Sequence, residues 1–203
     1  MRHIAHFVSS IFQPLLMPVY SVALLFVYTH FRIIFAAHFW YILTPAIIFS
    51  FALPAVTIYA LYKMQLISDL SLKRRSERFL PYFFTLISYS FMIYKYYRMG
   101  MPLWFLLLVA SPLLVIVLAM TITLRWKISA HMFGVGGLVG GGMAVAYFVE
   151  RNNPYYMFMG MFMIAGLIGT SRLLLRRHTI HQVYGGFLLG AVVTFLCVWI
   201  GAI

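Results

Sequence analysis

The sequence predicts an all-α protein, a polytopic membrane helical bundle with six or seven transmembrane helices. Hydrophobic residues make up 64% of the 203-residue chain and charged residues only 9%, which leaves too few polar side chains to cover the surface of a water-soluble fold. Apolar stretches long enough to cross a bilayer also recur along the whole chain, with short polar loops between them. Most of the surface is therefore expected to face lipid.

The individual spans follow from the length of these apolar stretches. A transmembrane helix needs about 20 predominantly apolar residues, and the candidate stretches are 11–30, 39–62, 80–97, 102–123, 131–149, 155–171 and 182–203. Pro14, Pro18, Pro45 and Pro54 lie in or beside the first two stretches and predict kinks there, or a partly re-entrant first span that would reduce the count to six. Neither an internal repeat nor an interdomain linker is visible, so residues 1–203 are expected to form one domain.

Three loops carry most of the ionisable residues of the chain. They are residues 73–81 (KRRSERFLP), 125–131 (RWKISAH) and 171–182 (SRLLLRRHTIHQ). Two predicted spans separate the first loop from the second, and two more separate the second from the third. All three loops are therefore expected on the same side of the membrane. Because ionisable groups are costly in such a chain and tend to mark functional sites, we expect the loops to form one site.

The residue types in these loops are suited to binding and transferring phosphate. Convergent lysine and arginine side chains, together with donors at helix N-termini, bind oxyanions, and phosphate has the geometry that several cations can share. His131 and His178 lie in the second and third loops. A neutral imidazole can attack phosphorus while a second imidazole protonates the leaving oxygen. The net charge of +12 is assigned to these loops and not to nucleic-acid binding.

The motifs in these loops resemble those of the type 2 phosphatidic acid phosphatase superfamily, which also contains the vanadium-dependent haloperoxidases. That family has a lysine with a downstream Arg-Pro, then Pro-Ser-Gly-His, then Ser-Arg, five residues, His, three residues and Asp. In this chain Ser171-Arg172 is followed by five residues and His178, and then by three residues and Gln182. The resemblance covers about residues 64–203, the part of the domain that carries the motifs.

The resemblance implies a role for each matching residue. His178 would be the nucleophile, His131 the general acid, and Gln182 would take the place of the residue that orients His178. The phosphate-binding residues would be Lys73, Arg78, Ser129, Ser171 and Arg172. The family's chemistry requires no metal and no cofactor.

The chain departs from the family pattern in all three motifs. Leu80 stands directly before Pro81, where the family has arginine, and the nearest arginine is Arg78, so that Arg74 or Arg75 could replace it. Ile128 and Ala130 stand where the second motif has proline and glycine. The third motif ends in Gln182, whose amide oxygen accepts a hydrogen bond without carrying a negative charge. By analogy with a catalytic triad whose acid is neutralised, turnover is expected to fall by about 10²- to 10⁴-fold unless another group compensates.

Each of these features also has a structural interpretation. Cytoplasmic loops of any membrane protein accumulate Lys and Arg, and 11 of the 15 cations are predicted on the side of the three loops. This interpretation fits Arg74, Arg75, Arg176 and Arg177, and it favours a cytoplasmic site. His131 could serve only as a hydrogen-bonding residue at a helix start. The glycines at 134–142 contain small-xxx-small spacings and are interpreted as helix packing.

The function that follows is an integral membrane lipid phosphatase. It would remove a phosphate monoester or a pyrophosphate from a lipid through a phosphohistidine intermediate, and it would reside in a bacterial inner membrane. Phosphatidate, phosphatidylglycerol phosphate, a polyprenyl diphosphate and a phosphorylated lipid A are all compatible, and membrane lipids are the expected surroundings. The alternative is a weak or inactive relative that binds phospholipid headgroups or supports another membrane protein. A transporter is less consistent with spans that contain almost no charge.

Overall fold

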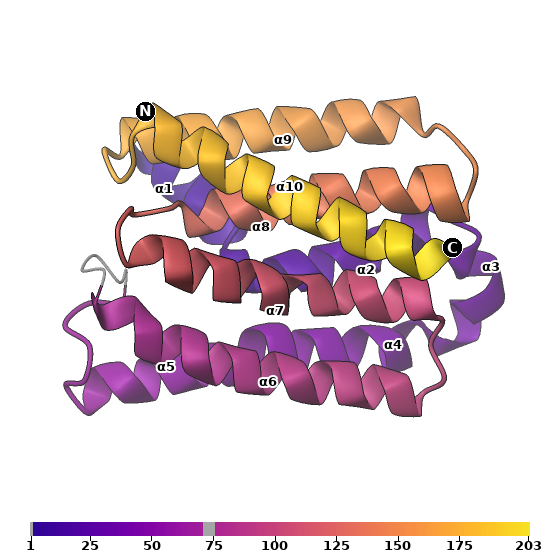
Figure 1. Cartoon of the computed structure of the whole chain (residues 1–203), viewed down its shortest axis with the longest axis horizontal. Coiled ribbons are helices and arrows are strands. Elements are labelled where there is room, and N and C mark those ends of the chain that lie inside the picture. The colour runs from indigo at the N-terminus through magenta and orange to yellow at the C-terminus, as the bar shows by residue number, and fades with distance from the viewer. Residues whose placement is uncertain (1, 71–75) are drawn as a thin grey trace.

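Helices that run along the molecule form a bundle, and the connections at its two ends join one helix to the next, as Figure 1 shows. The computed structural model describes residues 2–70 and 76–203. The longest helices are α6 (Phe79–Arg98), α7 (Leu103–Thr123), α8 (Ala130–Ala144), α9 (Tyr155–Leu174) and α10 (Ile180–Ala202). The shorter N-terminal elements are α1 (Arg2–Ile11), α2 (Met17–Tyr28), α3 (Phe31–Phe35), α4 (Phe39–Ala46) and α5 (Leu53–Lys63). The predicted all-α class is confirmed.

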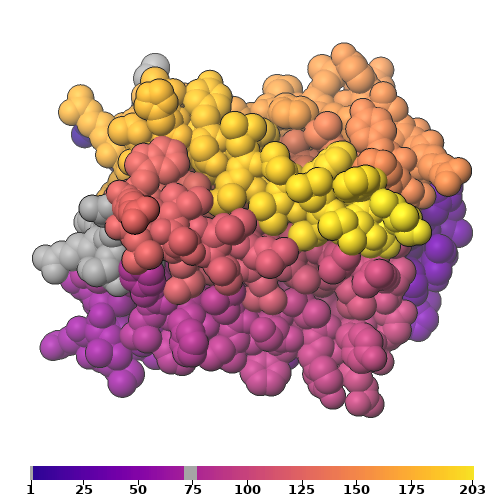
Figure 2. Space-filling view, in the orientation of Figure 1, coloured from indigo at the N-terminus to yellow at the C-terminus, as the bar shows by residue number. Residues whose placement is uncertain are grey.

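Within the described residues, six helical segments are long and apolar enough to cross a membrane. They are Arg2–Tyr28, Phe31–Lys63, Leu103–Thr123, Ala130–Val149, Tyr155–Leu174 and Ile180–Ala202. Helix α6 runs alongside α5 and α7 (Figure 1) and adds a further pass, although its serines, tyrosines and two cations make it less apolar. Figure 2 shows that α7 and α10 form much of one outer face of the molecule. Large apolar side chains of these two helices remain exposed, for example Leu114, Val117, Leu188 and Val192. Such a surface is that of an integral membrane protein.

Prolines interrupt the two N-terminal segments, as predicted. The first segment bends at a 3-10 turn, η1 (Pro14–Leu16), that separates α1 from α2. The second contains a π-helical stretch, η3 (Ile47–Ala52), between Pro45 and Pro54. Both irregularities are expected, because proline lacks the N–H that a helix interior needs and clashes with the preceding turn. The first helix begins at Arg2 and not near residue 11, so the first span is longer than predicted.

Glycines let α8 and α10 approach each other more closely than any other pair of residue types would allow. A Cβ atom built on Gly136 would lie 2.1 Å from the Phe187 carbonyl oxygen, and one on Gly190 would lie 1.9 Å from that of Phe133. Such distances are far shorter than real Cβ contacts, so only glycine fits. The packing role predicted for the glycines at 134–142 is therefore confirmed at Gly136, and Gly190 is their counterpart on α10. Because α8 and α10 begin at the same end of the bundle, this packing also brings their first turns together (Figure 1).

The two ends of the bundle differ in how they are packed. At the end where α2, α6 and α7 meet α3, the Phe31 and Phe105 rings stack at 5.5 Å, and Tyr96 packs edge-on against Phe105 at 4.9 Å. The buried Tyr96 hydroxyl donates to the Ile42 carbonyl oxygen at 2.7 Å. The opposite end is where α5, α7 and α9 end and α6, α8 and α10 begin. That end contains a large cavity.

Candidate functional site

The three cationic loops lie at one end of the bundle, as predicted from the even number of spans between them (Figure 1). Residues 64–70, 76–78, 124–129 and 175–179 belong to the connections at this end. A cavity of about 660 Å³ opens among them. Its charged and imidazole-bearing lining residues are His6, Arg78, Lys127, His131, Arg172, Arg177 and His178. The predicted convergence of the loops is therefore confirmed for their described residues.

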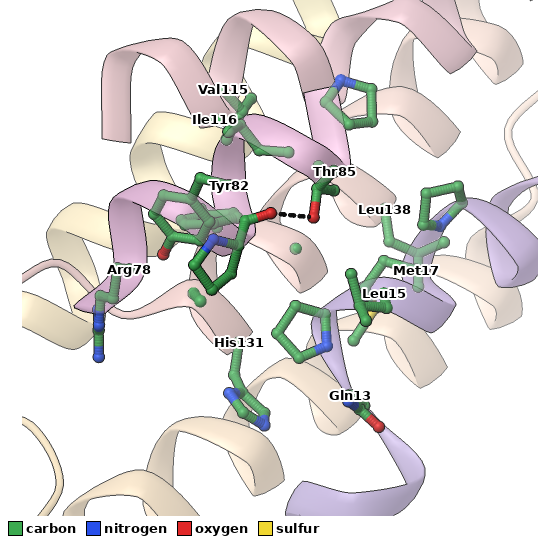
Figure 3. A pocket seen from close by; sticks show the side chains of 18 of the residues that line it. Gln13, Leu15, Met17, Arg78, Tyr82, Thr85, Val115, Ile116, His131 and Leu138 are labelled. Carbon is green, nitrogen blue, oxygen red and sulfur yellow. Dashed lines mark hydrogen bonds between the residues drawn. The ribbon is translucent and has the colours of Figure 1, made fainter. Parts of the chain in front are cut away.

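The cavity continues from its charged end into the apolar interior of the bundle. Leu15 and Met17 come from the start of α2 and the turn before it, Val115 and Ile116 from α7, and Leu138 from α8. Figure 3 shows these apolar side chains around the same space as Arg78, Tyr82 and His131. A ligand with a charged head and an apolar tail matches this lining, because each part meets surroundings of its own polarity.

His178 is held by Gln182 through one ring nitrogen. Its Nδ1 atom lies 3.1 Å from Gln182 Oε1, and the same oxygen accepts a hydrogen bond from the Thr179 backbone N–H at 3.2 Å. Because the backbone N–H must be a donor, the amide atom between the two residues is the oxygen, and Nδ1 of His178 must donate to it. The neutral ring therefore carries its proton on Nδ1 and keeps the lone pair on Nε2.

The charge state of His178 follows from its surroundings. The pKa of His178 is lowered from 6.5 to about 4, mainly because burial disfavours the charged ring. The hydrogen bond to Gln182 acts in the opposite direction, whereas the positive charges of Arg172, Arg78 and Lys127 lower the pKa further. His178 is therefore neutral near pH 7, the state that a nitrogen nucleophile requires.

His131, in the first turn of α8, is also held through one ring nitrogen. Its Nε2 atom donates to the Ser9 carbonyl oxygen at 3.1 Å, since a carbonyl can only accept. This leaves Nδ1 as the nitrogen available to a ligand. His131 and His178 both line the cavity and lie within electrostatic range of each other. The two predicted catalytic histidines thus share one site.

Two of the predicted phosphate-binding arginines line the cavity. Arg78 ends the short helix η4 (Ser76–Arg78) and is buried, and its Nη1 donates to the Ile128 carbonyl oxygen at 3.2 Å, which joins the first loop to the second. Arg172 lies in the last turn of α9, and its Nη1 donates to Ser9 Oγ at 3.3 Å. Among the described residues, no partner faces the buried Nε of Arg172. An oxyanion would satisfy this donor.

The other predicted phosphate-binding residues have different positions. Lys73, like Arg74 and Arg75, lies outside the described residues. Ser129 is the N-cap residue of α8, and its fully buried hydroxyl has no hydrogen-bond partner in the described part of the chain, although it does not line the cavity. The Ser171 hydroxyl donates to the Leu167 carbonyl oxygen of its own helix at 2.8 Å and is likewise absent from the lining.

Several lining residues are not part of the predicted site. Ser9 and His6 come from α1, which precedes all three motif loops. Lys127 and Arg177 belong to those loops, but neither is predicted as a phosphate-binding residue, and Arg177 is interpreted only as a charge that sets topology. A motif spacing cannot identify Ser9, because its partners His131 and Arg172 are 122 and 163 residues away in sequence. In residues 2–70 and 76–203, no three His, Cys, Asp or Glu side chains are grouped so that they could hold a metal ion.

Comparisons of the chain with models of protein families, with curated proteins and with solved structures find no match. The fold and the cavity define the class of protein by themselves. It is a helical integral membrane protein with a cationic cavity at one end of the bundle, and three histidines, His6, His131 and His178, line this cavity.

Proposed function

We propose that the protein is an integral membrane lipid phosphatase. The observation that supports this most directly is the pairing of His178 with Gln182 inside a cavity whose mouth is cationic and whose interior is apolar. The resemblance of the third loop to the type 2 phosphatidic acid phosphatase motif, and the presence of His131 in the same cavity, support the same function. The substrate would be a lipid phosphate monoester or a lipid diphosphate.

The geometry suggests how the residues would divide the reaction. Nε2 of His178 attacks phosphorus, the bond from phosphorus to the leaving oxygen breaks, and that oxygen takes the electron pair. His131 keeps Nε2–H on the Ser9 carbonyl, and its Nδ1 atom would relay to the leaving oxygen the proton that the bound phosphate carries. Water then attacks the phosphohistidine, Nδ1 of His131 accepts the water proton and passes it to the departing phosphate, and inorganic phosphate leaves with both histidines restored. Arg78 and Arg172 bind the phosphoryl oxygens throughout.

A second candidate function is phospholipid headgroup binding without turnover. Gln182 favours it, because this residue has a purely structural use as well. It lies at the third position of α10, and its side-chain oxygen accepts the N–H of the N-cap residue Thr179, as in a capping box. A glutamine kept as a helix cap would hold His178 in place without supplying the negative charge that a strong nucleophile needs.

The test is phosphate release by the purified full-length protein in detergent, without added metal. The panel would contain phosphatidate, phosphatidylglycerol phosphate and a polyprenyl diphosphate. Release is expected from at least one lipid and should fall by at least about 10³-fold in His178→Ala. The matched control is His38→Ala, which changes an exposed histidine at the opposite end of the bundle. Release that His178→Ala leaves intact contradicts the proposal, and lipid binding without release favours the second candidate.

A further inference from the structure

The N-terminal helix α1 contributes to the site although it contains none of the three motifs. Its exposed face carries Ile4 and Phe7, and its buried face carries Ala5 and Ser9, which are four residues apart and therefore lie on the same side of the helix. This buried face lies against α9, the helix that holds Arg172. The two residues beyond α1 that lead to Pro14 direct the chain into α2. Ser9 is thereby placed between α8 and α9.

Ser9 makes two hydrogen bonds, and each goes to a residue with a predicted role at the phosphate. Its carbonyl oxygen accepts Nε2–H of His131 at 3.1 Å, and its hydroxyl oxygen accepts an Nη1 hydrogen of Arg172 at 3.3 Å. Ser9 itself is buried, with 8% of its surface exposed. Both bonds are part-buried and lie at the wall of the cavity, which Ser9, His131 and Arg172 all line.

Each bond fixes a different property of its partner. The bond from His131 sets which ring nitrogen faces the ligand, in the same way that Gln182 sets it for His178. The bond from Arg172 restricts the position of the guanidinium group, because the group is rigid and planar and one of its nitrogens is held. With Nη1 held, the directions open to the Nε–H are also restricted, and in the described part of the chain this buried Nε has no hydrogen-bond partner.

We propose that Ser9 is a positioning residue that holds Arg172 and His131 in the geometry required to bind a phosphoryl group, so that α1 completes the site. This inference rests on the proposed function for its ligand class, a tetrahedral phosphoryl oxyanion. It assigns a role to a helix that lies outside the motif-bearing residues 64–203.

The experiment compares three full-length variants for binding of inorganic orthovanadate and for turnover of the best lipid substrate. Ser9→Ala removes the hydroxyl acceptor but keeps the backbone carbonyl, and Ser9→Thr restores a hydroxyl. Ser90→Ala is the matched control, since Ser90 is exposed on α6 and its hydroxyl donates only to Leu86 of its own helix at 3.0 Å. Orthovanadate is the probe because it has the shape and charge of phosphate. Its binding can be measured whether or not the protein hydrolyses lipid.

In Ser9→Ala, the vanadate dissociation constant and KM are expected to rise together by about three- to tenfold, the effect of losing one hydrogen bond, while kcat changes less. Ser9→Thr should return both values toward wild type. A purely structural role would lower the thermal unfolding midpoint and leave both constants unchanged, which would overturn the inference. Tighter vanadate binding would also overturn it, because Ser9 would then be a competitor for Arg172.

The outcomes separate the inference from the proposed function. If the wild type hydrolyses lipid through His178 but Ser9→Ala binds vanadate normally, the proposed function stands and the role of Ser9 is wrong. If the wild type releases no phosphate but binds vanadate, and Ser9→Ala weakens that binding, the role of Ser9 stands and the hydrolase assignment is wrong. If the wild type neither hydrolyses lipid nor binds vanadate, both are wrong.

Discussion

The oxygen that accepts the hydrogen bond from His178 belongs to the neutral amide of Gln182. The absence of charge on this amide controls the basicity of the candidate nucleophile. A carboxylate in the place of Gln182 would accept the same Nδ1 hydrogen bond and would also stabilise a positive ring. The amide supplies only the bond, so burial and the surrounding cations keep the pKa of His178 at about 4. The ring is thereby always neutral near pH 7, but it is a weaker base than a carboxylate-paired histidine.

The pH dependence of turnover should reveal this low pKa. Because the folded pKa of His178 lies below 6.5, the ring stays neutral as the pH falls through 6 and 5 and becomes protonated only near pH 4. The acid limb of kcat/KM is therefore expected near pH 4 and not near 6.5. Measuring kcat/KM between pH 4 and 8 checks this prediction. A loss of activity centred on pH 6.5 would contradict the burial and the neighbouring cations that lower the pKa of His178.

Replacing Gln182 by glutamate should shift the pH at which kcat/KM falls on the acid side. Glutamate has the reach of glutamine, so its carboxylate can accept the bonds from both His178 and Thr179, whereas aspartate is one methylene shorter. The added charge should raise the pKa of His178, shift the acid limb of kcat/KM to higher pH and increase kcat at pH 7 by about tenfold or more. Steady-state kinetics of Gln182→Glu against wild type measures both effects. A lower kcat together with an unmoved limb would indicate a site adapted to the amide.

Local spacing made part of the site predictable and left another part hidden. Thr179 and Gln182 have the spacing of a capping box at a helix start, which turns the Gln182 side chain back toward the N-cap and the preceding residue, His178. The even number of spans placed all three loops at one end without any knowledge of packing. Ser9, Lys127 and Arg177 could not be assigned in this way, because no rule of spacing states which side chains of different loops and helices meet across a cavity.

At the scale of helices, the glycine contacts between α8 and α10 control the distance between the two histidine-bearing turns. His131 lies in the first turn of α8, and His178 immediately precedes α10. Gly136 and Gly190, which let the helices touch, lie within two or three turns of these starts. A change in the separation of the helices would therefore change the separation of the two imidazoles.

Gly136→Ala tests this coupling. The new Cβ would meet the Phe187 carbonyl oxygen at 2.1 Å, so the backbones must separate. A loss of about 1–3 kcal/mol in unfolding free energy is expected, as for other overpacked interfaces, together with a large loss of turnover. The matched control is Gly160→Ala on α9, where nothing lies within 4 Å of the built Cβ. Unfolding in detergent and phosphate release measure both properties, and equal behaviour of the two variants would contradict the packing role.

The sequence predicted the starts of the last five helices closely. α6, α7, α8 and α9 start within one residue of the predicted stretches, and α10 starts within two residues, because hydropathy changes sharply there. α1 was missed, since Arg2, His3 and His6 lower the hydropathy of a helix that buries only one face. The position of α1 depends on its packing against α9. The hydropathy of a short stretch of sequence carries no information about such a contact.

For the whole molecule, the contrast between the two ends matches the distribution of charge. Among the described residues, the end with the cavity carries Arg2, Lys63, Arg78, Arg125, Lys127, Arg172, Arg176 and Arg177, and the densely packed end carries Arg32, Lys95, Arg98 and Arg151. The positive-inside rule counts such loop charges and predicts that the cavity opens toward the cytoplasm. Phosphorylated lipids of the inner leaflet would then be the accessible ligands.

Cysteine labelling in intact cells tests this orientation. In a Cys197→Ser background, Met64→Cys places a thiol at an exposed position near the cavity, and Asn153→Cys places one at the exposed opposite end. A membrane-impermeant maleimide should label Asn153→Cys directly and Met64→Cys only after the membrane is permeabilised. The reverse labelling pattern would place the cavity on the outer side of the membrane. The cations around the cavity would then bind phosphate and would not determine the orientation of the protein in the membrane. The count of eight cations at the cavity end against four at the other end would then overstate the preference for a cytoplasmic cavity. Arg78 and Arg172 would have to be left out of that count as phosphate ligands.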